Sequence, residues 1–337
     1  MGRINIDAII APECDLKTLA RLSKMAEKYN FNAIWMGDGA YQRDYASCLT
    51  IMAQATKRIG VGLAVTNPYL RHPIKSALAI ASVNEISGGR ALMGIGAGSL
   101  DTLKSLGHNW NMPVERISDM ITAVRSFLSG RSVELKTDTI SIEGVKAWMP
   151  LISPIPIYVG CRRPLMMRMA GRFADGVLLD NVPIEYLPFA LDQLKTGSEL
   201  SRRDFTKFDV GNLSIFAVSE DKKEAMKRVK RHLPYDFITI SKRELRAVGL
   251  TPRDIEPMLA ALRRQLPEDF MKASEFVTDY MVKNFSTSGT PEECIRRIKD
   301  YSRAGVTRIL LGLPTEPSDK PEETLKLAGE SILPELN

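Results

Sequence analysis

Two carboxylates stand in or beside apolar segments of the chain, where an acid could take part in chemistry. Asp7 interrupts the apolar segment Ile4–Ile10, and Asp38 lies between two glycines after Phe31–Met36. A carboxyl group in a dry pocket has a raised pKa and can donate a proton, so Asp7 predicts a general acid. The alternative for Asp7 is a carboxylate that is bonded to a neighbouring strand end or faces solvent below the rim. Asp38 predicts an acceptor for a ligand N–H or hydroxyl group, with a turn residue as the alternative.

A phosphate site is predicted at residues 160–164, where Gly-Cys-Arg-Arg-Pro leads from an apolar segment into an amphipathic one. Free N–H groups at the start of a helix bind phosphate, and an arginine such as Arg162 adds charge-assisted hydrogen bonds. An exposed loop is the alternative. Cys161 is a poor candidate nucleophile, because none of the 3 histidines lies near it in the sequence.

Few residues support metal or nucleophilic catalysis. The 3 histidines and 4 scattered cysteines do not form a zinc-site pattern, so we expect no metal. His72 precedes Pro73, which favours a structural role, and the chain has no GxSxG sequence. A phosphate-type site with few acid–base groups is typical of an enzyme whose cofactor supplies the chemistry.

The elements that must position these residues are short apolar segments that alternate with amphipathic ones. Asp15 can cap a helix, Pro73 suits a first helical position, and residues 290–293 form a capping-box sequence. We expect strands at about 4–10, 32–36, 59–65, 91–95, 155–159, 176–180, 209–218 and 307–311. Eight parallel strands with intervening helices predict an α/β fold, the (β/α)8 TIM barrel.

A doubly wound sheet is the alternative, but the glycines of residues 94–99 lack the dinucleotide-binding spacing. We interpret residues 130–150 as a β-hairpin insertion and residues 222–285 as a helical insertion before the last strand. Both would belong to one domain, 1–337. Because a barrel carries its active site at the C-terminal strand ends, we expect the site near residues 7–12, 37–39, 66–68, 96–99, 160–163, 180–181 and 312–314.

Composition excludes several classes of protein. The chain has 337 residues, with 46 Lys+Arg against 40 Asp+Glu and a net charge of +6. It has no run of five basic residues, and aromatics make up only 7%, so nucleic-acid binding is not expected. No stretch approaches the ~18 apolar residues of a membrane helix. The sparse cysteines fit a reducing compartment, and we expect a cytoplasmic protein that binds an anionic small ligand.

Several segments together resemble the bacterial-luciferase-like superfamily. They are TKRIGVG (56–62), VTNPYLRHP (65–73), NEISGGRALMGIGAG (84–98), PIYVG (156–160), AGRFADGV (170–177) and GTPEEC (289–294). Within the superfamily, residues 66–73 look most like the 5,10-methylenetetrahydromethanopterin reductases. These are archaeal enzymes of one-carbon metabolism and methanogenesis that use the deazaflavin coenzyme F420.

The resemblance implies where a cofactor and a substrate would bind. The deazaflavin would lie across the barrel mouth against a bulge with a cis peptide bond at Ala64-Val65. Asp38 would face the polar edge of the ring. The implied cofactor-binding residues are Asp38, Ala64, Val65, Thr66, Asn67, Gly96, Gly98, Gly160, Cys161 and Arg162. Asp7, in place of a family glutamate, and Ser99, in place of an aspartate, would face the pterin substrate, with Asp7 as the proton donor.

The expected reaction is hydride transfer between coenzyme F420 and methylene-tetrahydromethanopterin or a related pterin. An FMN-dependent monooxygenase of the same fold is one alternative, and a non-catalytic flavin-binding relative is another. We expect a homo-oligomer, either a dimer or a tetramer.

Overall fold

The computed structural model describes residues 4–336 except 12, 153 and 263–266. Its eight parallel barrel strands are β1 (Asn5–Ile10), β2 (Ala33–Met36), β3 (Gly60–Thr66), β4 (Ala91–Gly96), β7 (Ile157–Cys161), β8 (Gly176–Leu179), β9 (Asp209–Val218) and β11 (Arg308–Leu313). They pair in this order, and β11 pairs with β1, so the ring closes. The predicted TIM barrel is confirmed, and each strand lies within three residues of its predicted bounds.

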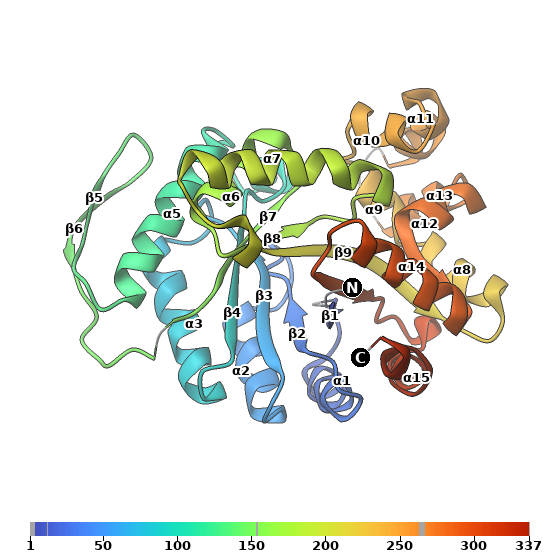
Figure 1. Cartoon of the computed structure of the whole chain (residues 1–337), viewed down its shortest axis with the longest axis horizontal. Coiled ribbons are helices and arrows are strands. Elements are labelled where there is room, and N and C mark those ends of the chain that lie inside the picture. Colours follow the sequence, from blue (N-terminus) through green and yellow to red (C-terminus); the bar gives the residue numbers. More distant parts are fainter. Residues whose placement is uncertain (1–3, 12, 153, 263–266, 337) are drawn as a thin grey trace.

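Helices surround the barrel (Figure 1). The long ones are α1 (Leu16–Lys28), α2 (Tyr45–Ala55), α3 (Pro73–Ser87), α5 (Pro113–Leu128), α6 (Pro164–Phe173), α7 (Leu187–Leu200), α14 (Pro291–Arg303) and α15 (Pro321–Leu327). The shorter ones are α4 (Leu100–Ser105), η1 (Ile184–Tyr186), η2 (Phe205–Lys207), η3 (Pro317–Asp319), the π-helical η4 (Ala328–Ile332) and η5 (Leu333–Glu335).

The predicted helix starts are confirmed by their capping hydrogen bonds. The Asp15 carboxylate accepts from the backbone N–H groups of Lys17 and Thr18 at the start of α1. Thr290 and Glu293 form the predicted capping box of α14. No helix in the described part of the chain is long and apolar enough to cross a membrane.

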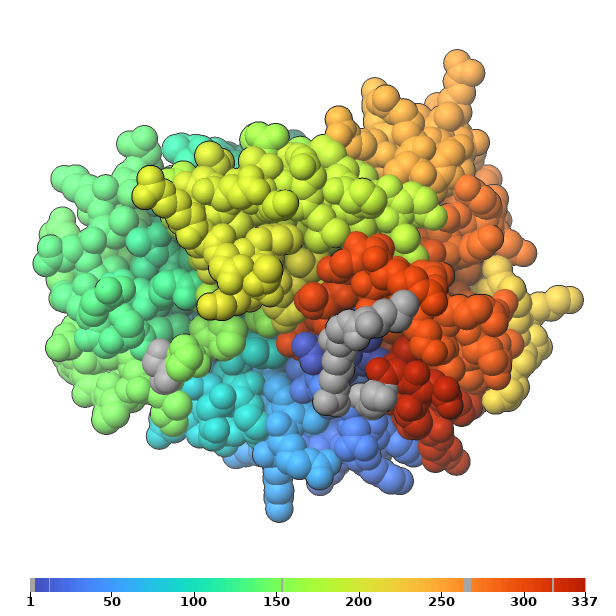
Figure 2. Space-filling view, viewed as in Figure 1, coloured from blue at the N-terminus to red at the C-terminus, as the bar shows by residue number. Residues whose placement is uncertain are grey.

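Two insertions depart from the regular repeat. The hairpin of β5 (Val133–Lys136) and β6 (Ser141–Val145) projects from one side of the barrel (Figure 1). The second insertion protrudes at the opposite end of the molecule, as Figure 2 shows for its orange segment. Its helices are α8 (Lys222–Lys230), α9 (Leu233–Phe237), α10 (Lys242–Ala247), α11 (Pro252–Ala261), α12 (Pro267–Ser274) and α13 (Asp279–Phe285).

The sequence analysis missed one strand at the end of this insertion. β10 (Ser286–Gly289) pairs in parallel with the outer half of β9, so the sheet has nine strands although eight close the barrel. Four residues with the sequence Ser-Thr-Ser-Gly carry no apolar pattern. The strand forms because β9 extends beyond β8, which pairs with β9 only as far as Asn212.

The chain has two main apolar cores. One lies between the barrel and its helices, and the other lies within the helical insertion and includes Ile215, Met281 and Phe285. Inside the barrel, the Trp35 and Tyr158 rings meet edge to face with centroids 5.4 Å apart. Gly62 makes room for this pair, because a Cβ atom there would lie 2.1 Å from the Trp35 ring.

Candidate active site

The bulge predicted in β3 is present at the C-terminal end of that strand. The Ala64-Val65 peptide bond is cis, and the pairing of β3 with β4 shifts between Leu63 and Thr66. Ala64 and Val65 are half-buried. The predicted cis bond is therefore confirmed, and two apolar residues face the barrel mouth there.

The glycines at the strand ends make room for this bulge. A Cβ atom at Gly96 would lie 2.4 Å from Val65 Cγ2, and one at Gly160 would lie 2.9 Å from Val65 Cγ1. At Gly94, a Cβ atom would lie 2.8 Å from Val65 Cγ1. Such distances are shorter than packed carbon atoms tolerate. Gly96 and Gly160 therefore have a packing role beside Val65, and their predicted contact with a cofactor stays a prediction.

Asp38 lies two residues after β2 in a hydrogen-bonded cluster with Thr66, the last residue of β3, and Arg71 of the loop that follows β3. Its carboxylate accepts hydrogen bonds from Thr66 Oγ1 at 2.7 Å, Arg71 Nε at 2.7 Å and Arg71 Nη2 at 3.0 Å. Arg71 also pairs with Asp44 at 2.8 Å and stacks on the Tyr45 ring. The bidentate pair with Arg71 holds the Asp38 carboxylate in one orientation. The Asp38 side chain is 7% exposed.

Two further residues of this loop have local structural roles. The Asn67 side-chain oxygen accepts from the N–H groups of Tyr69 and Leu70, which closes a turn. His72 Nδ1 accepts from Ile74 N and caps α3, as expected of a structural histidine.

The loop after β4 brings Gly98 and Ser99 to the same end of the barrel. Gly98 has a φ of 70°, which favours glycine, and a Cβ atom there would lie 3.5 Å from the Asn67 side chain. Ser99 is the N-cap residue of α4 but makes no side-chain capping bond. Its hydroxyl is therefore not committed to the helix, and its predicted contact with a substrate stays a prediction.

Asp7 occupies a different place from the other predicted site residues. It is the third residue of β1 and is fully buried. Its Oδ2 atom accepts from Trp35 Nε1 at 2.6 Å and from Arg308 Nη1 at 2.6 Å, while Oδ1 has no hydrogen-bond partner. Arg308 also pairs with Asp209 at 2.7 Å. Arg308 and Asp209 begin β11 and β9, so this cluster lies toward the N-terminal side of the barrel interior.

The buried position of Asp7 bears on its predicted role as a proton donor. Complete burial raises the pKa of Asp7, while Arg308 and the Trp35 hydrogen bond lower it. The placement matches the alternative weighed from the sequence, a carboxylate bonded to a neighbouring strand end, because Arg308 begins β11. The role of Asp7 as a proton donor and substrate contact stays a prediction.

Arg162 is committed to the helical insertion. Its guanidinium is 5% exposed and forms an ion pair with Glu244 at 2.6 Å. It also donates hydrogen bonds to the carbonyl of Asp236, the hydroxyl of Thr239 and the carbonyl of Asn181. A phosphate at Gly160-Cys161 would therefore depend on backbone N–H groups more than on this side chain. The Arg162 contact with a cofactor stays a prediction, and its hydrogen-bond partners are the Glu244 carboxylate, two backbone carbonyls and the Thr239 hydroxyl.

Sequence reasoning missed the partners of both arginines. Arg71 was part of a recognised segment but received no role, and its pairing with Asp38 needs the fold to be visible. Asn181 was expected at the site from its place after a strand, but its partners were not. Asp236 and Glu244 come from distant parts of the chain, and no local pattern marks them. Asn181 has a φ of 48°, which is uncommon for a residue other than glycine.

Other features near the strand ends are chemically quiet. All four cysteines are free and buried. Burial raises the pKa of the Cys161 thiol, which keeps it protonated and unreactive. Among the described residues, no group of three or more His, Cys, Asp or Glu side chains could hold a metal ion.

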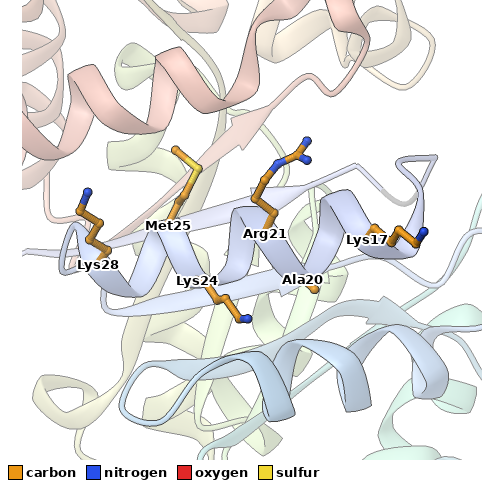
Figure 3. A pocket seen from close by; sticks show the side chains of 6 residues that line it. All are labelled: Lys17, Ala20, Arg21, Lys24, Met25 and Lys28. Carbon is orange, nitrogen blue, oxygen red and sulfur yellow. The ribbon is translucent and has the colours of Figure 1, made fainter.

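A surface pocket on α1 lies apart from the strand ends. Figure 3 shows its lining residues, all from that helix: Lys17, Ala20, Arg21, Lys24, Met25 and Lys28. Arg21 is paired with Glu322 of α15. The pocket contains none of the predicted site residues.

Known proteins share this architecture over the whole chain. A reductase of Methanolobus tindarius named 5,10-methylenetetrahydromethanopterin reductase is 32% identical over 323 residues, covering 96% of this chain and 97% of its own length. The protein of the same name from Archaeoglobus fulgidus is 31% identical over 326 residues, with 96% and 97% covered. The solved coenzyme F420-dependent tetrahydromethanopterin reductase of Methanopyrus kandleri superposes with a TM-score of 0.92 at 26% identity, with 100% of both chains covered.

The family model for luciferase-like monooxygenases matches residues 5–308. This match spans every barrel strand up to the first residue of β11, including the cis bulge of β3 and the glycines packed against it. The chain belongs to the luciferase-like monooxygenase family.

Proposed function

We propose that this protein is a coenzyme F420-dependent oxidoreductase that transfers a hydride between the deazaflavin and methylene-tetrahydromethanopterin or a related pterin. The observation that carries the proposal is the similarity to reductases of that name, which extends over 96% of the chain at 31–32% identity. The superposition on the F420-dependent reductase of Methanopyrus kandleri, at a TM-score of 0.92, supports the same reading.

The residues at the strand ends fit a flat, polar-edged ring with a phosphate-bearing side chain. Ala64 and Val65 present a half-buried apolar surface at the bulge. Beside it, Asp38 supplies a carboxylate that two donors already orient. Arg163 is exposed directly before α6 and adds a positive charge near the backbone of Gly160 and Cys161.

In this proposal the chain binds and orients, and the cofactor supplies the redox chemistry. When bound, coenzyme F420 would donate a hydride to the pterin or accept one from it. Ala64 and Val65 would support one face of the ring, and Asp38 would accept a hydrogen bond from its polar edge. The backbone at Gly160, with the helix start that follows, would hold the phosphate.

The rest of the site would hold the pterin. Ser99, at the start of α4, has a hydroxyl free to contact the substrate. We further propose that the chain forms one domain, assembles as a homo-oligomer and works in the cytoplasm.

Binding and turnover test the proposal directly. The purified protein is titrated with coenzyme F420 and, separately, with FMN, and the changes in absorbance and fluorescence are recorded. We expect F420 to bind and its visible absorbance to change when methylene-tetrahydromethanopterin is added. Binding of FMN alone, with oxygen consumption on turnover, would favour the monooxygenase instead. Binding without turnover of any pterin would identify a non-catalytic relative.

A further inference from the structure

The helical insertion is joined to the barrel mouth by a buried polar cluster. Its members, which we call the Arg162 cluster, are Arg162, Asn181, Asp236, Thr239 and Glu244. Arg162 directly follows β7, and Asn181 lies two residues after β8. Glu244 belongs to α10 and is fully buried, and Asp236 belongs to α9 and is 6% exposed. The cluster therefore connects two strand ends with two helices of the insertion.

Each member is held by more than one contact. Glu244 Oε1 accepts from Arg162 Nε at 2.6 Å, while its Oε2 accepts from Ser241 N at 2.8 Å in the α10 capping box. Asn181 Nδ2 donates to Asp236 Oδ2 at 2.5 Å and to the carbonyl of Phe285 at 2.7 Å. Phe285 immediately precedes β10. A shift of any one helix would therefore disturb the loop after β8 as well.

The same contacts constrain the backbone where a phosphate would bind. The Arg162 side chain donates to the carbonyl of Asn181 at 3.2 Å, which ties the loop after β7 to the loop after β8. The second loop is also bonded to β9, because Asn212 Oδ1 accepts from Val182 N at 3.2 Å. The neighbouring Arg163 donates to the carbonyl of Thr239 at 2.8 Å. The ends of β7 and β8, an interior residue of β9 and the insertion are thus joined around residues 160–163.

Charge supports a structural junction over a phosphate contact for Arg162. Two carboxylates lie close to its guanidinium, Glu244 at 2.6 Å and Asp180 at 3.7 Å. A guanidinium already paired with two carboxylates has little charge left to attract a phosphate. Its planar fork instead matches several acceptors at fixed angles, which lysine could not do.

We propose that Arg162 is a positioning residue, which sets the backbone of residues 160–163 for cofactor binding by holding the insertion through Glu244 and the loop after β8 through Asn181. The proposal rests on the proposed function for the identity of the cofactor, but its physical content is the conformation of this loop. As a positioning residue, Arg162 would contact neither the substrate nor the reacting atoms.

The test compares Arg162→Lys, Arg162→Gln and Glu244→Gln with one further variant of the loop and one control. The further variant, Arg163→Gln, removes an exposed charge from the same loop together with its hydrogen bond to the Thr239 carbonyl. The control lies outside the loop. Lys195→Gln breaks an exposed ion pair with Glu199 on α7. Affinity for coenzyme F420 is measured by titration at low and high salt, and kcat and the pterin KM are measured at saturating cofactor.

We expect the three cluster variants to weaken F420 binding by about 10- to 100-fold, because a small displacement of a binding loop has effects of this size. Their kcat and pterin KM at saturating cofactor should stay near those of the unaltered protein. The double variant Arg162→Gln/Glu244→Gln should lose no more affinity than either single one, since both remove the same contact. Arg163→Gln should reduce the salt dependence of binding, whereas Arg162→Lys should leave it unchanged.

A lowered melting temperature with unchanged F420 affinity in all three variants would overturn the proposal and leave the cluster a stabilising contact only. A reduced salt dependence in Arg162→Gln but not in Arg162→Lys would return Arg162 to direct phosphate binding. If the unaltered protein binds FMN in place of F420, the proposed function fails, and the same variants are titrated with FMN. If it binds neither, hydrogen exchange decides: faster exchange confined to residues 160–163 and 180–182 in Arg162→Lys supports the proposal, and unchanged exchange there overturns it.

Discussion

Arg308 Nη1 lies 2.6 Å from Asp7 Oδ2, and the same guanidinium bonds Asp209 through Nε at 2.7 Å. Asp7 is fully buried, and the Arg308 side chain is 12% exposed. One arginine therefore joins β1, β9 and β11 inside the barrel. A buried ion pair contributes little to the stability of the protein when it is intact. Removal of one partner is costly, because the other charge is then buried without a partner.

Asp7→Asn separates the two roles considered for Asp7. The contacts predict a loss of about 3 kcal/mol in the free energy of unfolding, with nearly normal kcat in the folded protein. A proton donor would instead lose about 10²- to 10⁴-fold in rate with unchanged stability. Denaturant unfolding and steady-state kinetics on the same sample distinguish the outcomes. Asp209→Asn is the matched control, since it weakens the same arginine contact from another strand.

Val65 and Gly96 provide a test of the bulge. Gly96→Ala creates a steric clash, because the added methyl group would lie 2.4 Å from Val65 Cγ2. We expect a loss of about 1–3 kcal/mol in stability and weaker cofactor binding. Val65→Ala in the same chain should recover much of both losses. Additive losses in the double variant would show that the glycine is needed for another reason.

Arg71 should control the contribution of Asp38 to cofactor binding. Arg71→Lys keeps the charge but loses the bidentate pair with the Asp38 carboxylate. We expect about a tenfold weaker affinity for F420, the equivalent of one charge-assisted hydrogen bond. Asp38→Asn should lower the affinity at least as much. Equal affinity in both variants and the unaltered protein, measured by titration, would remove Asp38 from the cofactor site.

The buried carboxyl group of Asp236 should make the stability of the protein depend on pH. Burial, followed by the nearby Asp180 carboxylate, raises the pKa of Asp236 to about 7 from its usual 3.8. Between these values the folded protein keeps a proton that the unfolded chain has released. The free energy of unfolding should therefore fall as pH rises from about 4 to about 7, by at most about 1.4 kcal/mol per pH unit, and then level off.

Unfolding of Asp236→Asn between pH 4 and pH 8 checks this assignment. The amide keeps the size of the protonated acid and cannot ionise, so the variant should lose this part of the pH dependence. Arg162, Asn181 and Glu244 also influence Asp236 and are unchanged in the variant. An identical pH profile in both proteins would assign the dependence to another group.

The barrel could be predicted from the sequence because its signals are local. Apolar segments such as Ala33–Met36 alternate with capped helices, and both patterns depend on residues a few positions apart. β10 was missed because its pairing depends on how far β9 extends. Asp38 was expected at the correct strand end, but the roles of Arg71 and Arg162 depend on carboxylates up to 82 residues away. Ion pairs depend on which side chains are close in the folded protein, and the separation of two residues in the sequence does not indicate this.

The ten-residue strand β9 faces a different environment on each side of its outer half. Phe216 and Val218 pack into the core between barrel and helices, whereas Ile215 and Ala217 pack into the core of the insertion. An engineered minimal barrel that lacked residues 222–289 would expose these two side chains and, because β10 would be missing, a row of unpaired backbone groups on β9. Exposed strand edges pair with strands of other molecules, so a chain shortened to its barrel should aggregate.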